Sequence, residues 1–188
     1  KSAGCGRAHD ATRDVRSGMA LDTALYSDLL ASAEAELAPA TKLRRHLHRN
    51  PELGLQLPST QAALLSELDG LGLEITTGTS TTGIRAVLHG DQDGPTMLLR
   101  ADMDALPLHE DADIDFASSD PDAMHACGHD LHVSMLVGAA RLLHARRKDI
   151  TGHVAFMFQP GEEGFHGAKH MLDEGLLDGI GGDERLMP

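Results

Sequence analysis

The chain has 188 residues, of which 41% are hydrophobic, and a formal net charge of -13, so it is long enough for one domain with a sizeable core and too short for two. The acidic excess argues against nucleic acid as a partner, because binding a phosphate backbone requires a basic surface. No apolar run approaches the roughly 20 residues that cross a bilayer, and no signal peptide is recognisable. We therefore expect a cytoplasmic protein without a membrane span, and its two cysteines are too few for a disulfide framework.

The N-terminal third of the chain predicts helices. Residues 1–20 have the composition of a disordered leader, and we expect the domain to occupy residues 21–188. Apolar residues recur at helical spacing over 22–38. Pro39 is expected to interrupt this helix, and a second helix is expected over 40–49.

The rest of the chain alternates between strand and helix patterns. β-rich runs over 84–89 and 96–103 flank a turn sequence at 90–95, and the segment 113–122 is acidic and irregular. The other expected elements are, in chain order, a helix from Ser59 or Thr60 to Leu71, a strand over 74–77, a helix over 129–147, a strand over 153–158 and a helix over 168–175. This order indicates an α/β fold with helix, sheet and helix in layers.

The segment from His125 to Asp130 carries the first candidate site. Cys127 and His129 are separated by one glycine, and a thiolate and an imidazole at this spacing can close on one metal ion. Because a second cysteine pair is missing, a structural zinc finger is disfavoured and a catalytic site with open positions is favoured. The alternative is a buried free cysteine beside the start of a helix, since free Cys is often a core residue.

Two adjacent carboxylates, Glu162 and Glu163, form the second candidate site. They follow the expected strand and a Pro-Gly turn, and sites in α/β sheets gather at the carboxyl ends of strands. Neighbouring side chains of an extended backbone point in opposite directions. One glutamate can therefore bind a metal while the other accepts a proton from metal-activated water. The alternative is a pair of solvated loop glutamates, which is the commoner role of such a pair.

Asp102 and Asp104 form the third candidate site, at the end of another expected strand. Period-two spacing places both carboxylates on one face of the strand, and carboxylates in such positions often orient an imidazole ligand of a metal. The alternative is a polar turn at the end of the strand. All three candidate sites lie at or just beyond an expected strand end, and together they offer the donors that one divalent cation uses.

Four motifs along the chain point to a known family. They are Arg44–Gly54, Leu99–Pro107, Met124–Asp130 and Phe158–Gly164. Through them the chain resembles the aminoacylase-type, metal-dependent amidohydrolases of the dinuclear-metal peptidase superfamily, in the branch of hippurate hydrolase and indole-acetyl-amino-acid hydrolases. The resemblance covers about residues 43–175 and implies the N-terminal portion of a zinc-exopeptidase-like catalytic domain.

The resemblance also implies roles for individual residues. Cys127, His129 and Glu163 would be metal ligands, Glu162 the general base, and Asp104 an orienter of a ligand. The implied reaction is hydrolysis of the amide bond of a small N-acyl amino acid, in which Glu162 deprotonates a metal-held water and passes the proton to the leaving amine. The family holds two divalent ions, and the donor set leaves zinc, manganese, cobalt and nickel open.

The chain also departs from the family it resembles. Members are about twice as long and carry two further histidine ligands and a lid or dimerisation domain. We therefore expect a truncated chain that holds one metal ion or none, folds only partly and is poorly active; homo-oligomerisation is an option for a full-length protein. Two alternatives stay open: an inactive metal-binding fragment, and a cysteine hydrolase with Cys127 as nucleophile and His129 or His125 as base, for which the Cys-x-His geometry is poor.

Overall fold

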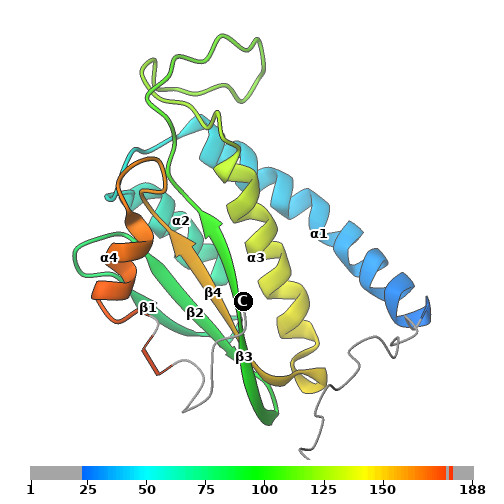
Figure 1. Ribbon diagram of the computed structural model, residues 1–188. Helices are drawn as coiled ribbons and strands as arrows, with labels where there is room; N and C mark the ends of the chain where they lie inside the picture. The colour runs from blue at the N-terminus through cyan, green and yellow to red at the C-terminus, as the bar shows by residue number, and fades with distance from the viewer. Residues whose placement is uncertain (1–22, 177, 180–188) are drawn as a thin grey trace, which may run out of the picture.

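The computed structural model describes residues 23–176 and 178–179 (Figure 1), and the leader expected over 1–20 lies outside these ranges. The described residues form a four-stranded sheet with helices packed on it. In chain order the elements are α1 (Thr23–Arg49), α2 (Pro58–Leu68), β1 (Glu74–Thr77), β2 (Ile84–His89), β3 (Gln92–Asp102), α3 (His129–Ala145), the 3-10 helix η1 (Arg147–Asp149), β4 (Thr151–Gln159) and α4 (Gly167–Asp173). Within these ranges no helix has the length and apolarity required to cross a membrane.

The sheet has the strand order β1-β2-β4-β3, so β4 lies between β2 and β3. β2 pairs antiparallel with both β1 and β4, whereas β3 and β4 run parallel, with Asp102 opposite Gln159 at their carboxyl ends. Parallel neighbours require a crossover connection, and the segment that contains α3 supplies it. The carboxyl ends of β3 and β4 and the residues that follow them therefore meet at the same end of the sheet.

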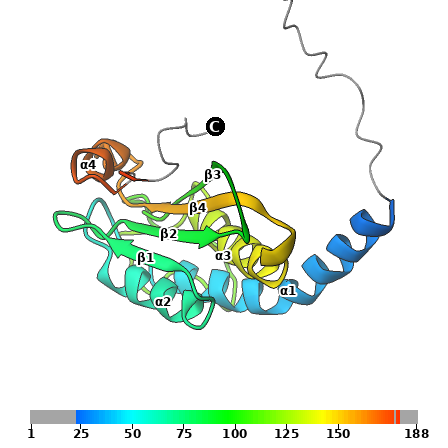
Figure 2. The ribbon, with the colours of Figure 1, turned by 90° about the horizontal axis from the view of Figure 1, so that it is seen from below.

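Helices cover both faces of the sheet, as the layered α/β prediction requires. Figure 2 shows α1, α2 and α3 on one face and α4 on the other. The main core lies on the three-helix side, where Phe156 and Phe158 of β4 are fully buried against leucines of α1 and α2. The residue between them, Met157, points to the opposite face and packs with Met171 of α4, as the alternation of side chains along a strand dictates.

α1 is one continuous helix, so the predicted interruption at Pro39 is wrong. A proline inside a helix removes one backbone hydrogen bond and costs about 3 kcal/mol, but packing of the neighbouring turns can offset that cost. Leu43, Leu47 and His48 after the proline are buried and hold the C-terminal half. The N-terminal half has the predicted helical spacing without burial, since Leu37, for example, is 66% exposed.

Most other predicted elements are present, with shifted ends. β1 and β2 have the predicted bounds, and the acidic segment 113–122 is irregular. β3 starts earlier than predicted because Gln92 already pairs with β4, with a register shift before Thr96. The turn predicted over 90–95 is therefore reduced to its first two residues.

Candidate metal site

Three predicted site residues converge where β3 and β4 end and α3 begins. His129 is the first residue of α3, Cys127 precedes it by two residues, and Glu163 follows the end of β4. One potential ligand atom from each of the three residues lies within 4.8 Å of the others. The fold thus gathers a sulfur, a nitrogen and an oxygen donor from two segments that are far apart in the sequence.

Two glycines shape the backbone at this site. Gly128, between the two motif ligands, has a left-handed conformation (φ 80°) and forms the N-cap of α3. Gly161, in the turn after β4, also has a positive φ of 66°, and a Cβ atom there would lie 2.6 Å from Leu55 Cδ2. Since L side chains rarely adopt positive φ, both turns that bring the ligands together depend on glycine.

Asp104 is the residue that ties the two segments together. Its side chain is buried, and its two carboxylate oxygens accept the backbone N–H groups of Glu162 and Glu163, each at 3.0 Å. Its backbone carbonyl accepts a hydrogen bond from His129 Nδ1 at 2.8 Å. Burial raises the pKa of Asp104, but the contact of its Oδ1 with His129 Nδ1 at 3.5 Å and the two backbone N–H groups outweigh burial and hold it below its usual value. Asp104 is therefore ionised and fixes both the glutamate pair and the imidazole.

The orientation of His129 follows from that contact. Because Nδ1 donates to Asp104, Nε2 faces the glutamates, at 3.9 Å from Glu162 Oε2 and 4.0 Å from Glu163 Oε1. These separations are too long for hydrogen bonds. Nε2 of the buried His129 ring thus points into the space between the imidazole and the two carboxylates, where a ligand can lie.

The local electrostatics favour a cation. The hydrogen bond with Asp104 raises the pKa of His129 to about 9, against the opposing effect of burial and with further support from the charges of Asp104 and Asp102. Hydrogen bonding with Glu163, burial and the charges of the surrounding carboxylates raise the pKa of the Cys127 thiol. A thiol that resists ionisation is a weak nucleophile, so these surroundings argue against the cysteine-hydrolase alternative.

The donor set fits a divalent metal ion. Glu163 Oε1 is buried and has no hydrogen-bond partner among the described residues, and buried polar atoms normally have one. A mixed set of sulfur, nitrogen and oxygen donors suits zinc and neighbouring transition metals. Glu162 is not part of the cluster, and 42% of its side chain is exposed.

Other polar residues lie close to the cluster. Asp102 is buried and pairs through Oδ2 with Arg100 at 3.0 Å, so it does not share the contacts of Asp104. With His129 and the exposed His132 it forms a second group of potential ligands within 4.8 Å. His125 is buried, and within the part of the chain that the structure describes neither ring nitrogen has a hydrogen-bond partner; burial above all lowers its pKa to about 4. The sequence offered no signal for this state of His125 beyond its place in the motif.

Comparison with known proteins connects this site to a family. Residues 98–186 match the model described as peptidase family M20/M25/M40. The chain is 44% identical over 139 residues to the IAA-amino acid hydrolase ILR1-like 2 of Arabidopsis thaliana, covering 74% of this chain and 31% of that protein. It is 45% identical over 139 residues to the N-acyl-L-amino acid amidohydrolase of Geobacillus stearothermophilus, covering 73% of this chain and 37% of that protein.

A solved structure agrees with these relatives. The YXEP protein of Bacillus subtilis, described as a dinuclear metal binding peptidase from the M20 family, superposes with a TM-score of 0.74 at 40% identity, over 78% of this chain and 42% of that one. The chain thus spans about a third of the length of the curated relatives cited above and less than half of this solved structure.

Proposed function

We propose that this chain, which carries the N-terminal part of a peptidase M20 domain, supplies metal ligands and the general base of an amidohydrolase that cleaves the amide bond of small N-acyl amino acids. The observation that carries the proposal is the convergence of Cys127, His129 and Glu163 beside Glu162. The printed names of the two relatives, an N-acyl-L-amino acid amidohydrolase and an IAA-amino acid hydrolase, support the substrate class.

Cys127, His129 and Glu163 would hold the metal ion. A bound divalent cation supplies Lewis-acid polarisation of the acyl carbonyl and makes water more acidic. Zinc, manganese, cobalt and nickel are all candidates, because a mixed donor set accepts each of them. Three donors are enough for one ion, and the described residues offer no complete second set that is independent of His129.

Glu162 is the proposed general base. Its backbone N–H is fixed by Asp104, while its side chain reaches solvent on the open side of the cluster, where a substrate and a water molecule have access. In the reaction it accepts a proton from the water that attacks the acyl carbonyl. It then donates that proton to the amine nitrogen as the carbon–nitrogen bond breaks, which yields a carboxylic acid and a free amino acid.

Asp104 is proposed to position the machinery without touching substrate. Its contact with Nδ1 selects the tautomer of His129 that presents Nε2 to the metal, a role that carboxylates and carbonyls often play behind histidine ligands. Its bonds to both glutamate N–H groups set the base and the third ligand at a fixed spacing.

Metal analysis combined with an activity assay tests this function. We expect the purified chain to bind close to one equivalent of Zn²⁺ or Co²⁺ and the variant Cys127→Ala to lose it. Glu162→Gln should retain the metal, and in a longer polypeptide that contains this segment it should lower the rate of N-acyl amino acid hydrolysis by about 100-fold or more. Metal-independent hydrolysis, or unchanged activity in Glu162→Gln, would refute the proposal. Metal binding without hydrolysis in any polypeptide context would leave only a metal-binding protein.

A further inference from the structure

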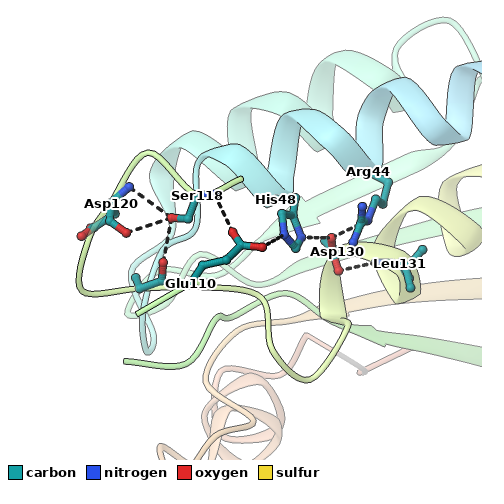
Figure 3. A network of polar contacts seen from close by, with 8 residues as sticks. Arg44, His48, Glu110, Ser118, Asp120, Asp130 and Leu131 are labelled. Atoms are coloured by element: carbon teal, nitrogen blue, oxygen red, sulfur yellow. Dashed lines mark hydrogen bonds and ion pairs between the residues drawn. The ribbon is translucent and has the colours of Figure 1, made fainter. Parts of the chain in front are cut away.

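A network of charged side chains joins α1, the loop before α3 and the first turn of α3 (Figure 3), and it includes none of the three candidate metal ligands. His48 of α1 is the centre: its Nδ1 lies 2.7 Å from Asp130 Oδ2 and its Nε2 lies 2.9 Å from Glu110 Oε1. Arg44, one turn earlier on α1, forms an ion pair with the same Asp130 oxygen at 2.8 Å. His48 and Asp130 are almost completely buried, so these contacts are shielded from water.

Whether both contacts of His48 are hydrogen bonds depends on the protonation of its ring. Both ring nitrogens face carboxylate oxygens, and an ionised carboxylate only accepts hydrogen bonds. Both contacts can therefore be hydrogen bonds only if the ring carries two protons and a positive charge. Burial raises the pKa of Glu110, but hydrogen bonds from His48 and from the Ser118 backbone N–H outweigh burial and lower it overall, which keeps Glu110 ionised.

Charge balance supports the same state. With a charged imidazole, the network contains two positive side chains, Arg44 and His48, and two negative ones, Asp130 and Glu110. A neutral imidazole would leave one uncompensated negative charge in a buried place, which is costly. The ring of His125 lies nearby, with its centroid 6.3 Å from that of His48.

Aromatic packing closes the network on its outer side. The ring of Phe116, in the irregular acidic segment, packs edge-on against His48 at a centroid distance of 5.4 Å. The guanidinium groups of Arg44 and Arg45 lie over the Phe116 ring at 4.7 and 4.8 Å from its centroid. The charged groups that face His48 are therefore Arg44 from its own helix, Glu110 from the loop and Asp130 from α3.

His48 contacts the chain on both sides of the motif that carries Cys127 and His129. Through Asp130 it holds the first turn of α3, where His129 is the neighbouring residue. Through Glu110 it holds the loop before α3, because Glu110 also accepts the Ser118 N–H at 2.6 Å and Ser118 Oγ donates to the Ala123 carbonyl at 2.7 Å. This loop leads directly into Cys127.

We propose that His48, in its doubly protonated form, is a positioning residue that sets the spacing of Cys127 and His129 by clamping the loop and the start of α3 to α1. The effect on metal binding rests on the proposed function. The clamp itself does not, because it exists in the metal-free chain. His48 contacts Asp130 and Glu110 and acts on Cys127 and His129 only through them.

Two measurements on the metal-free chain test the clamp. Nitrogen-15 NMR of the histidine rings should show both His48 nitrogens protonated at pH 7. In His48→Gln, which keeps one donor and one acceptor, the Ser118 amide should lose about tenfold or more of its protection against hydrogen exchange, since a charged hydrogen bond to its acceptor is lost. The matched control is His46→Gln, an exposed histidine on the same helix, which should change nothing.

A rescue variant separates charge balance from packing. Adding Glu110→Gln to His48→Gln removes the uncompensated carboxylate and lets two amides pair, so the Ser118 amide should recover part of its exchange protection. A singly protonated His48 ring at pH 7, or a Ser118 amide that His48→Gln leaves unchanged, would overturn the proposal.

The link to the metal is tested with Co²⁺ as the probe. We expect His48→Gln to weaken Co²⁺ binding by about tenfold, as positioning residues behind metal ligands typically do, while His46→Gln leaves it unchanged. If the unmodified chain binds no Co²⁺, the proposed function fails, and the ring protonation and exchange data still decide whether the clamp exists. Equal Co²⁺ affinity in His48→Gln and the unmodified chain would show that the clamp does not position the ligands.

Discussion

Two neighbouring residues at the start of α3 belong to opposite kinds of polar environment. Asp130 is fully buried, and its carboxylate is in contact with His48, Arg44 and its own helix. On the His129 side, Glu163 Oε1 is buried without a hydrogen-bond partner among the described residues, and Nε2 of His129 lies 4.0 Å from it. The Asp130 carboxylate is satisfied by its neighbours and holds the fold, whereas a buried carboxylate oxygen without a partner needs an explanation, which a bound cation would supply. The contrast separates the structural network from the candidate metal site.

The two histidines that flank Cys127 show the same contrast. Contact with Asp104 raises the pKa of His129 to about 9, whereas burial lowers that of His125 to about 4. Four residues of separation thus place one imidazole beside a carboxylate and the other in a site that excludes charge. The following predictions test how far this division into satisfied and unsatisfied groups holds.

The largest expected effect follows from breaking the satisfied network. Asp130→Asn keeps the shape of the side chain but leaves the partly buried charge of Arg44 and the buried His48 without their shared partner. Removing one member of a buried ion pair typically costs about 3–5 kcal/mol in the free energy of unfolding. Urea denaturation of the metal-free chain measures it, with the exposed Asp113→Asn as the control. A loss of less than about 1 kcal/mol would equate the network with an ordinary surface ion pair.

A second prediction concerns acid stability and His125. Because its pKa is lower in the folded chain (about 4) than the reference value of 6.5, the folded state binds this proton less readily than the unfolded one. The stabilisation is present above pH 6.5 and is lost as the pH falls through 4, and the shift corresponds to about 3 kcal/mol. His125→Phe should flatten the dependence of urea unfolding on pH between 6.5 and 4. An exposed counterpart, His109→Phe, should leave the profile unchanged.

A third, smaller effect is expected at the junction of the two environments. Asp104→Asn should lower the pKa of His129 toward its ordinary value and loosen the glutamate pair, which Asp104 holds through two backbone N–H groups. Loss of a group that orients a metal ligand typically weakens metal binding by about 10–100-fold, measurable by Co²⁺ titration at fixed pH. Asp102→Asn, which removes a neighbouring carboxylate paired with Arg100 instead, should have the lesser effect. The reverse order would assign the orienting role to Asp102.

Local patterns in the sequence predicted most of the elements, and three of the residues predicted to bind a metal lie close together. The bounds of β1 and β2 follow from short β-rich runs between turns, and Cys127, His129 and Glu163 lie together because their motifs follow or precede elements that end at one place. The helix interruption predicted at Pro39 is wrong because a propensity rule describes an isolated helix, whereas buried residues in the following turns hold α1 together.

Long-range pairing is what the sequence could not supply. His48 lies in a motif that supports the family resemblance, but its partners Glu110 and Asp130 are 62 and 82 residues away. A spacing of that size has no periodic signature, and an acidic segment such as 113–122 looks the same whether or not an aromatic residue from it packs on a histidine. The burial of His125 was hidden for the same reason, since a histidine in a motif looks identical whether it is solvated or enclosed.

The smallest effect on stability is expected at the candidate metal site. There Glu163→Gln makes the same carboxylate-to-amide change as Asp130→Asn makes in the His48 network, so the two variants compare the two environments directly. Glu163→Gln removes the negative charge of a carboxylate whose Oε1 has no hydrogen-bond partner among the described residues. The Glu163 backbone N–H keeps its hydrogen bond to Asp104. The free energy of unfolding in the presence of a chelator should therefore stay within about 0.5 kcal/mol of the unmodified chain. The pKa of the Cys127 thiol should fall, since Glu163 is the main cause of its rise, and thiol alkylation rates against pH would report it. A loss of unfolding free energy comparable to that of Asp130→Asn would mean that the Glu163 carboxylate stabilises the fold as much as the His48 network does. The unpartnered Oε1 would then no longer indicate a ligand site.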